Sequence, residues 1–310
     1  MIRQNFNADW TVEKGDGNSR MNSFLGNTQT QTVHLPYDAM IHEARTPDTK
    51  NGAQTGFYPG GEYIFQKLFT APQAWQGKPV SLVFEGVYQT ALVYLNGWLL
   101  TRNVNGYAEF TVEAGPYLKY GADNLLKVIA DNSLEPNSRW YTGSGVYRPV
   151  RLLVGNKVYL PQDTVRITTR EADEGFALLD VTAQVQSAST VTERMTLQQT
   201  ICREGTAVLT DRQNLLLQPG ESRTVSFRYC VDSPALWSPE NPNLYTSTMQ
   251  VLEGEEELDR EETSFGIRTL SIDAAHGVRI NGQTVKLRGA CIHHDNGILG
   301  AATLPDAEER

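Results

Sequence analysis

Short apolar runs of strand length, separated by turn-forming residues, fill most of the 310-residue chain and constrain its fold more than any other feature. The runs are rich in Val, Leu, Tyr and Phe, and Gly, Pro, Asn and Asp stand between them. Residues 63–69, 80–86 and 90–95 are clear examples. Helical periodicity is scarce before the end of the chain. This pattern predicts an all-β protein.

The first half of the chain predicts one β-sandwich. Asn96-Gly97 directly follows the run 90–95. Asn-Gly accepts the positive φ angles of a type I′ turn, so residues 92–100 are expected to form a tight hairpin. Further strands are expected at residues 106–112, 124–131 and 146–154. Regular short strands separated by turns favour a jelly-roll or similar sandwich over residues 1–157.

A second series of strands begins near Val165 and ends near Ile267, which indicates a second sandwich over residues 158–268. About seven short strands in roughly a hundred residues are typical of an immunoglobulin-like sandwich. The sequence LQPGE at residues 217–221 supplies turn chemistry between two of the strands. The acidic stretch 253–262 lies between strand candidates, and we expect it to be a solvated hairpin tip.

The pattern changes after Gly266. Residues 278–287 predict a compact hairpin around Asn281-Gly282, and a polar loop containing histidines follows. Pro305 and the acidic residues after it are typical of the first turn of a helix. We interpret residues 269–310 as the beginning of a third domain that this chain does not complete.

Composition and charge exclude several classes of partner. Hydrophobic residues make up 40% of the chain, but no apolar run approaches the roughly 20 residues that span a bilayer, so no membrane association is expected. The formal charge of -9, without a basic cluster, gives no electrostatic basis for binding nucleic acid. The first residues do not resemble a secretory signal, and the cytoplasm and the periplasm both stay open. The three cysteines are expected to be buried thiols.

The densest group of chemically active side chains is His293-His294-Asp295. A metal site is not expected there, because adjacent histidines point to different sides of an extended chain and no third ligand has a recognisable spacing. Nucleophilic catalysis is not expected either, since the chain has no GxSxG elbow and Cys291 has no evident means of lowering its pKa. We expect no metal and no cofactor.

A second cluster, NSRWYTGSGVYR at residues 137–148, suits carbohydrate. The flat face of Trp140 can stack on the C–H face of a sugar ring, and Arg139 can donate hydrogen bonds to hydroxyl groups. The alternative is a structural turn, in which Gly143 permits a bend and Trp140 fills a seam between domains. The same two interpretations apply to the aromatic, Gly-rich loop at residues 55–61.

Four segments in this order resemble glycoside hydrolase family 2. They are GVYQTALVYLNG at 86–97, SGVYRPV at 144–150, LWSPENPNLY at 236–245 with FGIR at 265–268, and NGQTVKLRGACIHHD at 281–295. The resemblance covers nearly the whole chain and implies a jelly roll, an immunoglobulin-like sandwich and the start of a (β/α)8 barrel. It also implies that Arg288-Gly289 lies in the first barrel strand.

The resemblance implies a set of substrate-binding residues. His293 matches a histidine that contacts sugar hydroxyls, and the loop with Arg139 and Trp140 borders the same pocket; Asp295 completes the predicted set. In some members this loop contributes a carboxylate, whereas the nearest residues here are Ser138 and Arg139. No catalytic residue is predicted within the chain, because the family's acid/base Glu and nucleophile Glu belong to later barrel strands.

The resemblance implies the N-terminal, non-catalytic portion of a retaining β-glycosidase. We expect a β-galactosidase acting on terminal β-galactosides, with β-glucuronidase and β-mannosidase as alternatives within the family. A stand-alone carbohydrate-binding β-sandwich protein is the alternative from another class. In every case the expected partner is a carbohydrate, and a homo-oligomer is left open.

Overall fold

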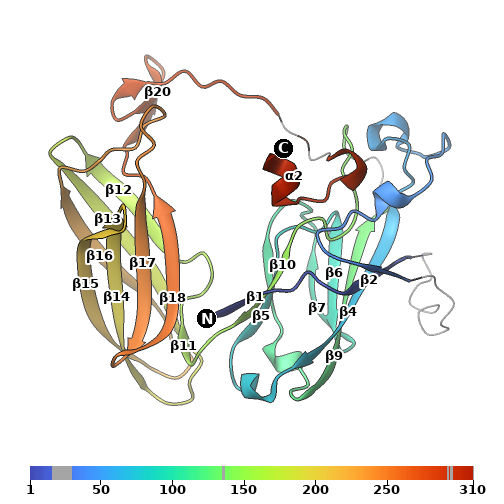
Figure 1. Cartoon of the computed structure of the whole chain (residues 1–310), viewed down its shortest axis with the longest axis horizontal. Coiled ribbons are helices and arrows are strands. Elements are labelled where there is room, and N and C mark those ends of the chain that lie inside the picture. The colour runs from blue at the N-terminus through green and yellow to red at the C-terminus, as the bar shows by residue number, and fades with distance from the viewer. Residues whose placement is uncertain (16–29, 135–136, 292, 294–295, 310) are drawn as a thin grey trace. The chain divides into compact units, whose positions relative to one another are not determined.

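The structure is a computed structural model that describes residues 1–15, 30–134, 137–291, 293 and 296–309. Strands dominate it, and the all-β prediction is confirmed (Figure 1). The chain divides into two compact units. One unit comprises Ile2–Val154 and Cys291–Arg310, and the other comprises Gly155–Ala290 with Met1.

The first unit is a sandwich of two antiparallel sheets. The six-stranded sheet has the order β3-β2-β4-β9-β6-β7, and the four-stranded sheet has the order β1-β10-β5-β8. The strands are β1 Ile2–Asn5, β2 Trp10–Lys14, β3 Gln31–Val33, β4 Gly61–Ala71, β5 Val80–Phe84, β6 Thr90–Leu95, β7 Trp98–Asn103, β8 Phe110–Glu113, β9 Ala122–Asn132 and β10 Val150–Val154. Short 3-10 turns lie at Met40–His42, Gly52–Thr55, Gln73–Trp75 and Gly115–Tyr117.

The core of this sandwich lies between its two sheets. Trp10, Phe65 and Leu126 from one sheet and Phe84 and Leu152 from the other are almost completely buried in one cluster. Inward-facing side chains alternate with outward-facing ones along each strand, so apolar residues at every second position create this layer. Burying large side chains of this kind contributes about 1.5–3 kcal/mol each.

Local turn chemistry explains where the strands of the first sandwich begin. The predicted hairpin turn is confirmed, because Asn96 and Gly97 have φ angles of 52° and 88°. The strand expected at 106–112 starts only at Phe110, since the Asn105 side chain accepts hydrogen bonds from the backbone N–H groups of Tyr107 and Ala108 and forms a turn there.

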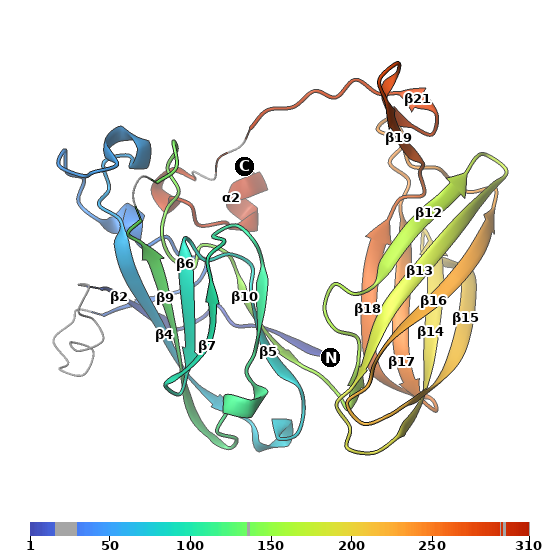
Figure 2. The same cartoon turned by 180° about the vertical axis from the view of Figure 1, so that it is seen from behind.

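The second unit is a sandwich of a sheet with the order β11-β13-β12, in which β13 also pairs with β16, and a sheet with the order β15-β14-β17-β18 (Figure 2). The strands are β11 Val158–Tyr159, β12 Arg166–Ala172, β13 Phe176–Ser187, β14 Glu193–Arg203, β15 Thr206–Leu217, β16 Ser222–Asp232, β17 Tyr245–Glu253 and β18 Glu256–Phe265. Val181, Leu197, Phe227 and Met249 are among its buried core residues.

Two expectations from the sequence are wrong, one for the cysteines and one for the acidic stretch. The cysteines are not buried thiols: Cys230 and Cys291 are exposed and Cys202 is half-buried. Cys230 lies on the outward face of β16, and the side chains before and after it, Tyr229 and Val231, face inward. The acidic stretch is a hairpin tip only around Gly254; Asp259, within β18, is 2% exposed and binds the Leu160 backbone N–H and the Met1 amino group.

The residues after the second sandwich form a small hairpin sheet of β19 Leu270–Asp273, β20 Gly277–Ile280 and β21 Gln283–Thr284. Its turn has positive φ angles at Asn281 and Gly282, as the Asn-Gly sequence predicts. Arg288 and Gly289, expected in a first barrel strand, lie in chain without secondary structure. A strand needs a neighbour for its ladder hydrogen bonds, and the described residues offer none there. The barrel and the predicted domain boundaries therefore stay predictions.

Candidate functional site

The buried carboxylate of Asp38 joins three separate segments of the first unit. Its Oδ1 accepts hydrogen bonds from the backbone N–H groups of Met40 (3.0 Å) and Ser144 (2.9 Å). Its Oδ2 accepts from the hydroxyl of Tyr141 (2.6 Å) and the backbone N–H of Ala301 (2.9 Å). Asp38 is only 1% exposed, so its carboxylate has lost its water. The four donors compensate for the lost hydration. The C-terminal segment is thereby attached to the sandwich.

Two glycines allow the close approach around Asp38. Gly143 and Gly300 have φ angles of 65° and 59°, which favour glycine. A Cβ atom on Gly143 would lie 2.5 Å from the Cβ of Ala301, and one on Gly300 would lie 2.2 Å from Asp38 Oδ2. Neither position has room for a side chain, so glycine is required at both.

The C-terminal segment is folded as well as attached. The 3-10 turn Gly297–Leu299 is closed by a hydrogen bond from the Asn296 N–H to the Gly300 carbonyl (2.7 Å). The Thr303 N–H donates to the Tyr147 carbonyl (2.9 Å), and Ala301 is buried beside that tyrosine. The short helix α2 Pro305–Glu309 follows, which confirms the predicted helix start. This turn therefore has a fixed place on the first sandwich.

A pocket of about 560 Å³ lies beside this turn. Its lining residues are Ile41, Arg45, Gly56, Tyr58, Tyr141, Gly297 and Ile298. The rings of Tyr58 and Tyr141 meet edge to face, with centroids 5.7 Å apart and planes at 65°. The Arg45 guanidinium lies over the Tyr58 ring, 5.0 Å from its centroid. The volume is within the range of sites that bind small molecules.

This pocket brings together the two aromatic, Gly-rich loops that the sequence singles out at residues 55–61 and 137–148. The predicted bend at Gly143 is confirmed by its positive φ angle. Asp38, Arg45 and Ile298 stand in no sequence motif that indicates a site. An isolated Asp or Arg gives no local signal when its partners are distant in sequence.

The predicted substrate-binding residues are only partly described. The rings of Trp140 and His293 stack, with centroids 4.4 Å apart and planes at 25°, although the two residues are far apart in sequence. Arg139 is exposed, and its side chain forms no hydrogen bond or ion pair with the described residues. Asp295 lies outside the described residues. Their role in binding sugar stays a prediction.

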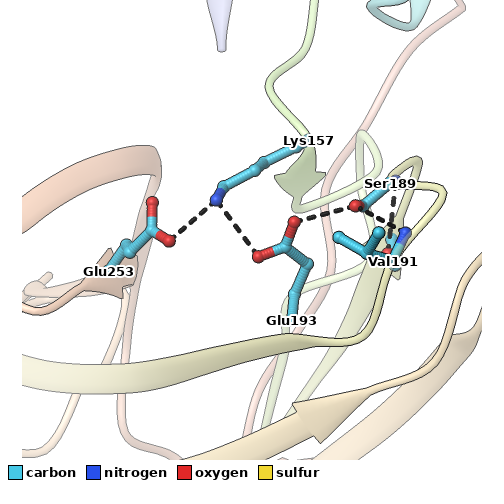
Figure 3. Close-up of polar contacts among 6 residues, drawn as sticks. Lys157, Ser189, Val191, Glu193 and Glu253 are labelled. Atoms are coloured by element: carbon cyan, nitrogen blue, oxygen red, sulfur yellow. Dashed lines mark hydrogen bonds and ion pairs between the residues drawn. The ribbon is translucent and has the colours of Figure 1, made fainter.

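A charged cluster in the second sandwich has a structural role (Figure 3). Lys157 Nζ bridges Glu193 Oε2 (3.1 Å) and Glu253 Oε1 (2.7 Å), and the Ser189 hydroxyl donates to Glu193 Oε1 (2.8 Å). The Ser189 hydroxyl in turn accepts from the Val191 N–H (3.2 Å). The hydrogen bond from Ser189, followed by that from Lys157, holds the pKa of Glu193 below its ordinary value against the opposing effect of burial. Both Glu193 oxygens are occupied, so this carboxylate stabilises the fold.

Neither a membrane span nor a metal centre is found in the ranges that the structure describes. None of the helices there is long and apolar enough to cross a membrane. In the same ranges no three His, Cys, Asp or Glu side chains gather closely enough to hold a metal ion.

Sequence profiles match both sandwiches to one class of protein, the glycoside hydrolases. Residues 10–177 match the "Glycosyl hydrolase 2 galactose-binding domain-like" profile, and residues 158–268 match the "Glycosyl hydrolases family 2" profile. The first match alone covers more than half of the chain. The chain belongs to glycosyl hydrolase family 2, as the sequence motifs predict.

Individual relatives agree with this family. The chain is 35% identical to a beta-galactosidase of Bacteroides ovatus, over 99% of this chain and 36% of that protein. It is 30% identical to a putative beta-glucuronidase of Formosa agariphila, over 97% of this chain and 28% of that protein. A crystal structure of a family 2 member from Bacteroides cellulosilyticus matches all of this chain and 41% of its own, with a TM-score of 0.90 and 32% identity. The chain thus spans about a third of the length of these curated relatives.

Proposed function

We propose that this chain forms the N-terminal, non-catalytic region of a retaining β-glycosidase that hydrolyses terminal β-galactosides. The observation that carries the proposal is the 35% identity to a beta-galactosidase along 99% of the chain. A match of this extent includes both sandwiches and the His293 segment. The choice of galactoside follows from that relative's name.

The catalytic carboxylates are proposed to lie outside residues 1–310. A retaining glycosidase needs an acid and a nucleophile whose carboxyl groups are about 5–5.5 Å apart. Three buried carboxylates of this chain are engaged elsewhere: Asp38 binds four donors, Glu193 binds Ser189 and Lys157, and Asp259 binds Leu160. None of these three is free to protonate a leaving group or to attack an anomeric carbon.

The chain's own contribution is proposed to be one wall of the sugar site. The indole of Trp140 stacks on the His293 imidazole, and we propose that this contact orients the imidazole ring. The imidazole can then exchange hydrogen bonds with sugar hydroxyls, and the exposed Arg139 can donate others. Asp295 is proposed as a further acceptor for hydroxyl groups.

A β-glucuronidase is the second candidate. It is favoured by the 30% identity to a putative beta-glucuronidase along 97% of the chain. The two candidates differ in whether the reactive sugar carries a carboxylate. A comparison of substrates therefore separates them.

The test is to assay the enzyme that contains residues 1–310 together with the region supplying the carboxylates. We expect kcat/KM for an aryl β-galactoside to exceed that for the glucuronide and the mannoside by at least about tenfold. Replacement of Trp140 by Ala is expected to lower kcat/KM by about three- to tenfold, as loss of an aromatic contact does. The control Trp98→Ala changes a side chain that is 66% exposed and should have no effect. Preferential turnover of the glucuronide would overturn the galactoside assignment.

A further inference from the structure

We propose that the pocket of Arg45, Tyr58 and Tyr141 binds a sugar ring that carries a carboxylate, with the carboxylate held by Arg45. A hexuronate residue of a saccharide has this chemistry. The choice of a sugar as the carrier of the carboxylate rests on the proposed function. The preference for an anion rests on the pocket itself.

Among the described residues that line the pocket, one side chain is charged, and it is the cation of Arg45. Arg45 is exposed and forms no ion pair with any residue that the structure describes. None of the described residues that line the pocket is an Asp or a Glu. The carboxylate of Asp38, which binds the lining residue Tyr141, is already occupied by four donors. The part of the chain that the structure describes therefore supplies no anion to Arg45 in this pocket.

The position of Arg45 suits a carboxylate in particular. Its guanidinium carbon lies over the Tyr58 ring, 5.0 Å from the centroid, and a contact of this kind uses none of the N–H donors in an ordinary hydrogen bond. The N–H donors lie in the plane of the group and stay available at its edge. Two of these donors match the two oxygens of a carboxylate, which makes this pair stronger and more directional than a pair with lysine.

The other walls suit the rest of a sugar ring. Tyr58 and Tyr141 meet at 65° and present aromatic surface, while Ile41 and Ile298 add aliphatic surface. The C–H groups of a pyranose ring pack on surfaces of this kind. Ile298 is 89% exposed, so its side chain is not used in the core.

The pocket is built before any ligand enters. The Tyr141 hydroxyl is fixed on Asp38, and the Ala301 N–H fixes the turn that carries Ile298 on the same carboxylate. A hydrogen bond from the Thr46 N–H to the Phe57 carbonyl (2.9 Å) holds the segment of Arg45 against the loop of Tyr58. Side chains held in place lose less conformational entropy on binding.

The test is an NMR titration of the 310-residue chain with methyl β-D-galacturonide and, separately, with methyl β-D-galactoside. We expect the galacturonide to bind at least about tenfold more tightly, with shifts at the amides around Arg45 and Gly297. Replacement of Arg45 by Gln should remove this preference, and Arg45→Lys should restore it only in part. In Ile298→Asp, a carboxylate at the pocket should compete for Arg45 and weaken galacturonide binding. Arg194→Gln, at an exposed position of β14, is the matched control and should not change it.

Equal affinity for the charged and neutral glycosides would overturn the proposal, as would unchanged galacturonide binding in Arg45→Gln. Tighter binding of benzoate than of the galacturonide would refute the sugar as the carrier of the carboxylate. None of these titrations requires catalysis. A negative result here therefore leaves the galactoside assay unaffected, and a failed galactoside assay does not decide these titrations.

Discussion

At the scale of single residues, Asp38 shows how one side chain can organise a site. Its donors are two backbone N–H groups of the sandwich, one tyrosine hydroxyl and the N–H of Ala301, which is 263 residues away. If this carboxylate is removed, its donors are left without an acceptor. Each buried donor left unsatisfied costs about 1–3 kcal/mol.

Replacement of Asp38 by Asn or Ala is expected to destabilise the chain. Asn keeps one acceptor oxygen but directs an amide NH2 at two donors, and Ala leaves all four donors unsatisfied. We expect the free energy of unfolding to fall by about 2–4 kcal/mol, more for Ala than for Asn. Urea unfolding measures this loss, and amide hydrogen exchange at Ala301 should accelerate.

The matched control for Asp38 is Asp48→Asn, at an exposed position, which should change stability by no more than about 0.5 kcal/mol. An unchanged exchange rate at Ala301 in Asp38→Ala would show that this carboxylate does not hold the C-terminal segment.

The sequence allows some of the candidate site to be predicted and not the rest. Trp140 and His293 can be chosen from the motifs around them, and the structure stacks their rings. Arg45 and Asp38 cannot be chosen in this way, because their importance comes from partners that only folding brings near. A charged residue in a loop is usually solvated, and nothing adjacent to Arg45 in sequence distinguishes it.

At the scale of elements, alternation of apolar and polar residues predicts most strands. The pattern fails for β15, because ten of its twelve residues are exposed or half-buried and only Leu215 and Leu217 are buried. A strand on the edge of a sheet needs few inward side chains, so its sequence resembles a loop. The Asn-Gly turns were predictable because positive φ angles restrict the choice of residue.

Cross-strand ion pairs in the second sandwich should make its stability depend on pH. Asp180 on β13 accepts hydrogen bonds from Arg228 on β16 (2.7 Å) and Arg170 on β12 (2.5 Å). The hydrogen bond from Arg228, followed by that from Arg170, lowers the pKa of Asp180 to about 2. The unfolded chain has an ordinary pKa of about 3.9. The stabilisation is therefore present above pH ~4 and is lost as the pH falls from about 4 to about 2.

The measurement for Asp180 is the free energy of unfolding between pH 2 and 5, with carboxyl carbon NMR to follow its titration. Asp180→Asn should remove part of the pH dependence, whereas Asp232→Asn, at an exposed position of β16, should not. Identical pH profiles for the parent and Asp180→Asn would contradict the assignment.

At the scale of the whole molecule, the chain combines two sandwiches of one glycoside hydrolase family with a C-terminal segment that packs on the first of them. A sequence reading places residues 269–310 in one continuous domain, whereas Cys291–Arg310 group with Ile2–Val154 in space. Sequence order alone could not show this, because the grouping depends on hydrogen bonds such as that from Thr303 to Tyr147. The segment thus brings His293 to Trp140.

The most direct test of the proposed function is the configuration of the first sugar released from an aryl β-galactoside. The enzyme containing residues 1–310 and the catalytic carboxylates is followed by proton NMR, which distinguishes β-galactose from α-galactose before they interconvert. A retaining mechanism through a glycosyl-enzyme intermediate predicts that β-galactose appears first. First release of α-galactose, or no hydrolysis of the galactoside, would contradict the account.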